Sequence, residues 1–186
     1  IRAISVLIWN GIFTAMLSAA SSSGAMRRWM ALWLPRLPSD RLKRASAAPP
    51  DARPVAVYEK MKNAFALTGL DRTASASGLH VGMALADARA IRPDLYAVEA
   101  DPGADAALLD DIADWCGRFT PIVVKDPPHG LLLDITGCAH LFGGEKALLK
   151  DAERRIMAEG FAVRAAIAPT PGAAFALSRT GKGRIV

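Results

Sequence analysis

Apolar residues recur at intervals of three or four positions in two segments of the chain, from Asp105 to Phe119 and from Glu145 to Glu159. The apolar positions of the first segment are Leu108, Ile112, Trp115 and Phe119. Those of the second are Leu148, Leu149, Ala152 and Ile156. This spacing places each set on one face of a helix, so the pattern predicts two amphipathic helices, the second ending at Gly160.

Shorter apolar runs predict strands at "MALWL" (Met30 to Leu34), "VAVYE" (Val55 to Glu59) and "YAVEA" (from Tyr96). The runs "PIVVKD" and "GLLLDI" are separated by the tight connection "PPH" and therefore predict a hairpin. In "FAVRAAIA" apolar residues occupy alternate positions, which is typical of a half-buried strand.

The connections carry turn and capping residues. Pro35 and Pro38 end the first strand, and a basic loop rich in proline and alanine is expected after them. A helix is expected from about Met83 to Ile91, before Pro93. Thr170 followed by Pro171 predicts the start of another helix, with the threonine as its cap.

The resulting order is strand, insertion, helix, strand, strand, helix, strand, which is the split βαββαβ order of ferredoxin-like domains. We therefore expect a mixed α/β (α+β) fold with a small basic subdomain inserted after the first strand. The expected divisions are an N-terminal extension (1–26), the first strand (27–34), the insertion (35–100) and the remainder of the main domain (101–186).

Charge is distributed unevenly along a chain of 186 residues with a net charge of +5. Nine Lys or Arg and three Asp or Glu lie between Arg27 and Lys62, whereas the numbers are five and eleven between Asn63 and Asp134. A basic segment beside an acidic one suits a surface that binds a polyanion, although a solvated basic surface explains the charge equally well.

The two cysteines, Cys116 and Cys138, are too few for a disulfide framework, and a metal ion is not expected because a structural zinc site needs four ligands. The first 25 residues have the outline of a secretory signal, with one Arg, an apolar run and small residues. The run is interrupted and short for a membrane span, so an over-extended gene start or a fragment boundary is favoured. We expect a cytoplasmic protein with reduced thiols and no membrane contact.

Four sequence blocks follow one another in a recognisable order: "LWLPRLPSDRL", "GLHVGMALADARAIRPDL", "ADWCGRFTPIVVKDPPHGLLLDITGCAHLFGG" and "AIAPTPGAAFALSR". Together they resemble the palm and fingers of Y-family (UmuC/DinB-like) translesion DNA polymerases. The resemblance is strongest to the ImuB-type branch, the polymerase-like subunit of bacterial mutagenesis cassettes. It covers about Arg28 to Arg179, and the thumb, little finger and clamp-binding tail that it implies fall outside this chain.

In active family members an acidic residue ends the first palm strand, and an Asp-Glu pair precedes the "LDIT"-like block. In this chain these positions carry Trp33, His129 and Gly130. Two-metal phosphoryl transfer needs converging carboxylates, and magnesium prefers oxygen ligands. The resemblance therefore implies a site that has lost its metal ligands, and we expect no catalytic residue, metal ion or cofactor.

The family's phosphate-binding side chains are altered as well. The Tyr and Arg of the fingers fall at Arg72 and Ser75, and two palm lysines fall at Pro171 and Phe175. Arg72 alone keeps a charge that can contact a phosphate.

Asp134 ends the run of leucines, where the family keeps a packing carboxylate. We expect it to accept hydrogen bonds from the Thr136–Gly137 turn. A makeshift metal site formed by Asp126 and Asp134, holding Mg²⁺, is the alternative. Trp33 is expected to pack in the space of the lost metals rather than to stack on a base, and His129 is expected to be an exposed turn residue.

Seven basic residues are the expected DNA contacts, and because they would bind phosphates, the binding should be independent of sequence and sensitive to salt. They are Arg36, Arg41, Lys43, Arg44, Lys60, Lys62 and Arg72.

The resemblance implies a non-catalytic adaptor in the damage-induced (SOS) response. Such an adaptor would bring together primer-template DNA, the sliding clamp, an error-prone replicative-type polymerase and a RecA-like companion protein. Two alternatives remain open: an active error-prone polymerase with a rearranged metal site, and a protein-interaction module that does not bind DNA.

Overall fold

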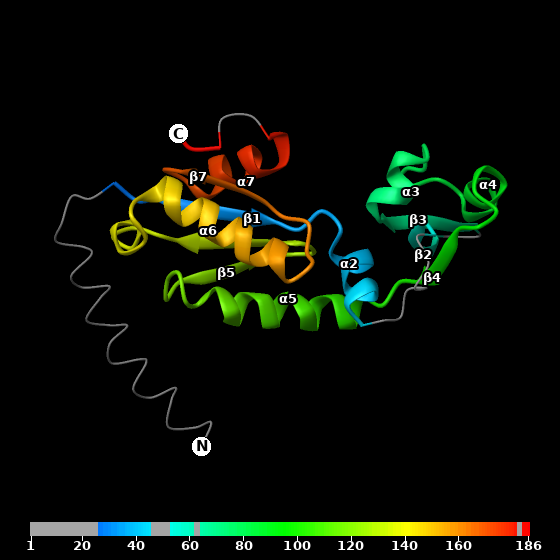
Figure 1. Ribbon diagram of the computed structural model, residues 1–186, viewed down its shortest axis with the longest axis horizontal. Coiled ribbons are helices and arrows are strands. Elements are labelled where there is room, and N and C mark those ends of the chain that lie inside the picture. The colour runs from blue at the N-terminus through cyan, green and yellow to red at the C-terminus, as the bar shows by residue number, and fades with distance from the viewer. Residues whose placement is uncertain (1–25, 46–52, 62–63, 182–183) are drawn as a thin grey trace, which may run out of the picture.

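The computed structural model describes residues 26–45, 53–61, 64–181 and 184–186. Three parts of the sequence predictions lie outside the described residues. They are residues 1–25 of the expected N-terminal extension, part of the expected basic loop, and Lys62. The described chain forms two lobes, each built on its own sheet (Figure 1). The large lobe contains a four-stranded sheet and the small lobe a three-stranded sheet.

The sheet of the large lobe consists of β1 (Trp29–Trp33), β5 (Val123–Asp126), β6 (Gly130–Asp134) and β7 (Arg164–Ala168). Its order is β5-β6-β1-β7, with antiparallel neighbours throughout. The chain reaches β5 through α5 (Pro102–Cys116), and it passes from β6 to β7 through η1 (Ala139–Phe142) and α6 (Glu145–Ala158). This is the ferredoxin-like order, so the predicted fold class is confirmed.

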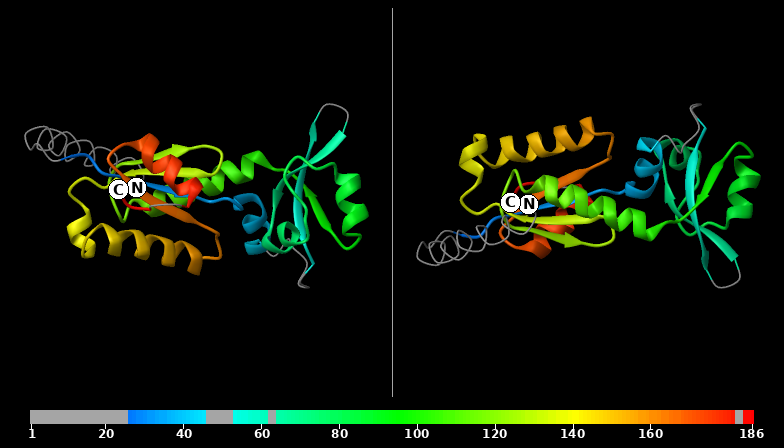
Figure 2. Two further views of the ribbon diagram at one scale, coloured as in Figure 1. Left: turned by 90° about the horizontal axis from the view of Figure 1, so that it is seen from above. Right: turned by 90° about the horizontal axis from the view of Figure 1, so that it is seen from below.

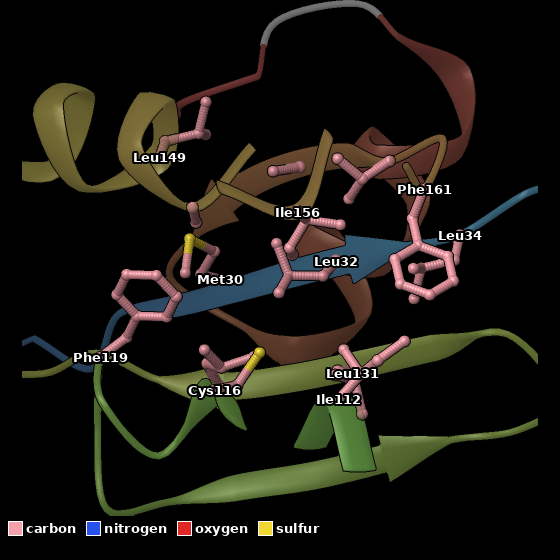
Figure 3. Close-up of a cluster of buried hydrophobic side chains, with 14 of the residues drawn as sticks. Met30, Leu32, Leu34, Ile112, Cys116, Phe119, Leu131, Leu149, Ile156 and Phe161 are labelled. Atoms are coloured by element: carbon pink, nitrogen blue, oxygen red, sulfur yellow. The ribbon is translucent and has the colours of Figure 1, made fainter. Parts of the chain in front are cut away.

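The main core lies between one face of this sheet and the helices α5 and α6. Met30 and Leu32 of β1 are buried against Ile112 of α5 and Ile156 of α6 (Figure 3). Each such side chain contributes about 1.5–3 kcal/mol when it leaves water. The helical faces predicted from the sequence are the faces that point into this core.

The opposite face of the sheet is covered by α7 (Pro171–Thr180). Small side chains meet there, with Ala31 and Ala168 of the sheet packed against Ala174 of the helix. Thr170 caps α7 as predicted, because its hydroxyl accepts a hydrogen bond from the amide of Ala173 at 3.2 Å. The predicted half-burial of the last strand is wrong: residues 165–168 are all buried, since helices cover both faces.

The small lobe consists of β2 (Val55–Met61), β3 (Ala64–Leu70), β4 (Tyr96–Glu99), α3 (Arg72–Ala76) and α4 (Leu85–Ile91). β2 pairs antiparallel with β3 and parallel with β4. The strand β3 was not predicted, because "AFALTGL" mixes alanine and glycine with its apolar residues and resembles no strand pattern. The predicted helix before Pro93 is present as α4.

The helix α2 (Leu37–Arg44) corrects the prediction of a loop after the first strand. Pro38 lies in its first turn, where a missing amide hydrogen costs no helical hydrogen bond. The prolines that end β1 are therefore compatible with a helix that begins at once. Figure 2 shows α2 between the two lobes from above and from below.

Side chains of α2 contact both lobes. Leu37 belongs to the core of the large lobe, whereas Leu42 packs on Val55 and Val57 of the small lobe. Asp40 accepts a hydrogen bond at 2.8 Å from the amide of Ala162, which precedes β7. Burial raises the pKa of Asp40, while this hydrogen bond and nearby cations oppose the rise. The helix thus fixes the small lobe beside one end of the large sheet.

None of the helices in the described ranges is both long and apolar enough to cross a bilayer.

Candidate functional site

Four residues lie side by side across the large sheet at the end nearest the small lobe. The strand register places Trp33 opposite Gly130 on one side and opposite Arg164 on the other, and it places Gly130 opposite Asp126. Residues that lie directly opposite each other in antiparallel strands share a face of the sheet. The row Asp126–Gly130–Trp33–Arg164 therefore faces the side covered by α7.

The structure brings together the three positions that the sequence predicted as former carboxylates. Trp33 and Gly130 are register partners, and the carbonyl of His129 accepts a hydrogen bond from the amide of Leu34 at 2.8 Å. These positions carry an indole, an imidazole and a hydrogen atom. None of them offers the anionic oxygen that a magnesium site requires.

Arg179 of α7 occupies the space over this row. Its Nη2 lies 3.0 Å from Oδ2 of Asp126, and its guanidinium carbon lies 3.4 Å from the centre of the Phe175 ring. The same carbon lies 5.5 Å from the centre of the Trp33 ring, and that of Arg164 lies 5.4 Å from it. We call these five residues, Trp33, Asp126, Arg164, Phe175 and Arg179, the Trp33 cluster.

Trp33 is half-buried rather than enclosed in the core, so the prediction of a core packing residue is only partly right. Its ring contacts two guanidinium groups, and cation–π contacts of this kind contribute about 0.5–1 kcal/mol at exposed sites.

The two aspartates of the alternative metal site do not meet. Asp126 pairs with the first residue of β6, Gly130, whereas Asp134 is the last residue of that strand, about 13 Å along an extended chain. Asp134 accepts a hydrogen bond at 3.0 Å from the amide of Thr136, as predicted. Among the described residues, no three His, Cys, Asp or Glu side chains lie close enough to hold a metal.

A pocket of about 290 Å³ opens between the lobes beside this site. His129 of the large lobe and Arg36 at the start of α2 line one side of it, and Ser75 and His80 of the small lobe line the other. His129 is therefore half-buried in the pocket, which corrects the prediction of an exposed turn residue. Burial lowers the pKa of His129, and the charge of Asp105 partly opposes this effect.

Three of the predicted DNA contacts make ion pairs within the protein. These pairs are Arg41–Asp105 at 2.6 Å, Lys43–Asp71 at 2.6 Å and Arg44–Glu159 at 3.3 Å. Arg44 also lies over the ring of Phe161, 4.7 Å from its centre. The charges of α2 thus join the helix to both lobes. These ion pairs were not predicted, because the acidic partners lie far along the chain from α2.

The remaining predicted cations are placed differently. Lys60 and Arg72 are exposed, and neither forms an ion pair within the described part of the chain. Arg36 lines the interlobe pocket, and Lys62 lies outside the described residues. Pro171 begins α7, and Phe175 supports Arg179 instead of replacing a lysine charge.

Two residues of the site, Arg164 and Arg179, were not predicted from the sequence. Arg164 interrupts the apolar run "FAVRAAIA", which is a detectable signal for a residue on the edge of the site. Arg179 gave no signal, because its approach to Asp126 depends on how α7 crosses the sheet.

Comparison with known proteins agrees with this geometry. Residues 47–179 match the model of the impB/mucB/samB family. The chain belongs to that family. Its Y-family resemblance, predicted from the separated sequence blocks, is thereby confirmed.

Proteins similar to this chain include the Protein ImuB of two Caulobacter vibrioides strains, NA1000 / CB15N and ATCC 19089 / CIP 103742 / CB 15. Identity to each is 52% over 104 residues, which is 56% of this chain and 23% of the relative. The matched segment thus spans about a quarter of the curated relatives.

Solved structures of similar fold include DinB from Sulfolobus solfataricus, with a TM-score of 0.67 and 14% identity. That match covers 86% of this chain and 48% of DinB. A post-insertion binary complex of Dbh DNA polymerase gives a TM-score of 0.73 at 15% identity, with coverage of 85% and 47%. These likenesses show the polymerase fold of this impB/mucB/samB member.

Proposed function

We propose that this chain is part of a non-catalytic Y-family polymerase homologue that acts as a DNA-binding adaptor in damage-induced translesion synthesis. One observation carries the proposal. The three positions that supply metal-binding carboxylates in active members meet at one point as Trp33, His129 and Gly130.

The surroundings of this point support the same conclusion. Asp126, the acid in the row, is paired with Arg179 instead of being open to a cation. Gly130 has no room for a side chain, because a Cβ would lie 2.9 Å from the carbonyl oxygen of Asp126. An active polymerase with a rearranged site would need Asp126 and Asp134 together, and the length of β6 separates them.

The similarity to ImuB agrees with the resemblance found in the sequence, and that resemblance suggests the adaptor role and its partners. In this proposal the protein acts in the cytoplasm and places primer-template DNA near the sliding clamp, an error-prone replicative-type polymerase and a RecA-like protein. DNA binding is sequence-independent and uses exposed cations such as Lys60 and Arg72.

A second candidate is a protein-interaction module without DNA binding. It is favoured by one observation, the commitment of Arg41, Lys43 and Arg44 to internal ion pairs. These cations are less available to phosphates than the sequence suggested.

The proposal is tested with purified full-length protein and a fluorescent primer-template. Binding is measured by anisotropy over a series of salt concentrations, and primer extension is measured in the same buffer with Mg²⁺ or Mn²⁺. We expect binding whose logarithm falls linearly with the logarithm of the salt concentration, without incorporation. Absence of binding at low salt would instead support the interaction module. Incorporation that Asp126→Ala or Asp134→Ala abolishes would support the active polymerase.

A further inference from the structure

Two guanidinium groups share one indole ring at the end of the large sheet. The guanidinium carbons of Arg164 and Arg179 lie 5.4 Å and 5.5 Å from the centre of the Trp33 ring. They come from different elements, the strand β7 and the helix α7. Both cations therefore lie beside the same ring, and each attracts an anion that comes near it.

The Trp33 cluster contains one carboxylate for these two cations. Asp126 pairs with Arg179 at 3.0 Å, and no ion pair of Arg164 occurs among the residues that the structure describes. The cluster therefore carries a net charge of about +1 at neutral pH. Because Arg164 is exposed, an anion from solution can reach it.

The cluster is also held in place before any ligand binds. Arg179 is fixed by Asp126, by the Phe175 ring and by the carbonyl of Phe175, to which its Nη1 donates at 3.3 Å. Arg164 donates from Nη1 to the carbonyl of Arg179, also at 3.3 Å. Within the described chain this is its one hydrogen bond from the guanidinium, so the Nε and Nη2 donors remain for a ligand.

We propose that the Trp33 cluster binds one phosphodiester of the DNA backbone directly, with Arg164 as the contacting residue and without a metal ion. The charge supports this ligand, since each backbone phosphate carries a single negative charge that matches the net charge of the cluster. A planar guanidinium with free adjacent donors suits the two oxygens of a phosphate. Asp126 and Phe175 hold the side chain of Arg179, and the backbone carbonyl of Arg179 accepts the hydrogen bond from Arg164. This inference rests on the proposed DNA binding and adds the place where a phosphate is held.

The test compares the full-length protein with its Arg164→Gln and Arg164→Lys variants in binding to the primer-template. Arg154→Gln is the matched control, because Arg154 is an exposed arginine of α6 on the other side of the sheet. For Arg164→Gln we expect affinity to fall about fivefold to tenfold at low salt. The slope of log affinity against log salt should decrease by about one. Arg164→Lys should keep the slope, and Arg154→Gln should keep both quantities.

Other results would overturn the inference in distinguishable ways. If the wild-type protein binds DNA and Arg164→Gln leaves the slope of log affinity against log salt unchanged, no phosphate binds at Arg164. The proposed adaptor function would still stand. Failure of the wild-type protein to bind DNA would overturn the adaptor function and this inference together. If a free deoxynucleoside triphosphate binds more weakly to Arg164→Gln and DNA binding is unchanged in that variant, the ligand of Arg164 is a nucleotide and not the DNA backbone. Loss of wild-type binding in EDTA would contradict a metal-free contact.

Discussion

The Nη2 atom of Arg179 lies 3.0 Å from the Oδ2 atom of Asp126, and both side chains are about one quarter exposed. The ion pair crosses from α7 to the end of β5, beside the positions that would hold metal ligands in an active polymerase. A side chain of the protein therefore supplies the positive charge at this point. Asp126, the carboxylate of the row, is therefore paired with a cation of the protein itself.

Asp126→Asn should lower the free energy of unfolding by about 0.5–1 kcal/mol, because it leaves Arg179 without its charged partner. Urea unfolding at low salt measures this change. Asp111→Asn is the control, since Asp111 is an exposed residue of α5. Combining Asp126→Asn with Arg179→Gln should cost less than the sum of the single changes. Strict additivity would contradict a direct pair.

Gly130→Ala should destabilise the protein by about 1–3 kcal/mol. A Cβ at this position would lie 2.7 Å from Oδ2 and 2.9 Å from the carbonyl oxygen of Asp126, and the backbone oxygen cannot move freely. Gly172→Ala is the matched control, because a Cβ there meets no atom within 4 Å and lies in the first turn of α7. It should leave stability equal or raise it by about 0.5–1 kcal/mol. Equal effects of the two changes in thermal unfolding would contradict the crowding at Gly130.

His129 should make the protein less stable as the pH falls below 6.5. Burial lowers the pKa of His129 in the folded state, so the unfolded chain takes up a proton first. The contribution of His129 to the free energy of unfolding is complete above its pKa in the unfolded chain. It is lost as the pH falls through the pKa of His129 in the folded protein. Urea unfolding at about pH 7.5 and about pH 5.5 measures the difference. His129→Gln should reduce this pH dependence, and the exposed His140→Gln should not. The same pH dependence in both variants would contradict the assignment.

The two cysteines should differ in reactivity. Burial raises the pKa of Cys116 to about 12, and its side chain is enclosed in the large core, whereas Cys138 is half-buried. A thiol reagent at neutral pH should label Cys138 in the native protein and both cysteines in urea. Mass spectrometry of the labelled peptides measures this difference. Rapid native labelling of a Cys138→Ser variant would contradict the burial of Cys116.

The sequence allowed the fold of the large lobe to be predicted because its elements have strong local patterns. The apolar positions of α5 and α6 recur at helical spacing, and the hairpin of β5 and β6 carries its own turn. The small lobe was predicted less completely. The helix α2 begins at prolines that also end a strand, and β3 lacks a clear alternation.

The sequence predicted which metal-binding carboxylates the candidate site lacks. It did not predict the contacts of the side chains that are present there. The resemblance located Trp33, His129 and Gly130, and the strand register brings them together. What fills the site was not visible, because Arg179 and Asp126 are 53 residues apart and belong to elements of different type. Local sequence patterns indicate which face of a helix is apolar. They do not indicate which arginine contacts which aromatic ring in the folded protein.

The loss of catalysis is tested most directly by single-nucleotide incorporation, with an excess of the purified full-length protein on a primer-template and Mn²⁺. We expect no extended primer above the level of a protein-free control, although the DNA is bound. Extension that requires the metal and disappears in Asp126→Ala would show that this site still performs phosphoryl transfer. That result would contradict the loss of catalysis on which the proposed function depends.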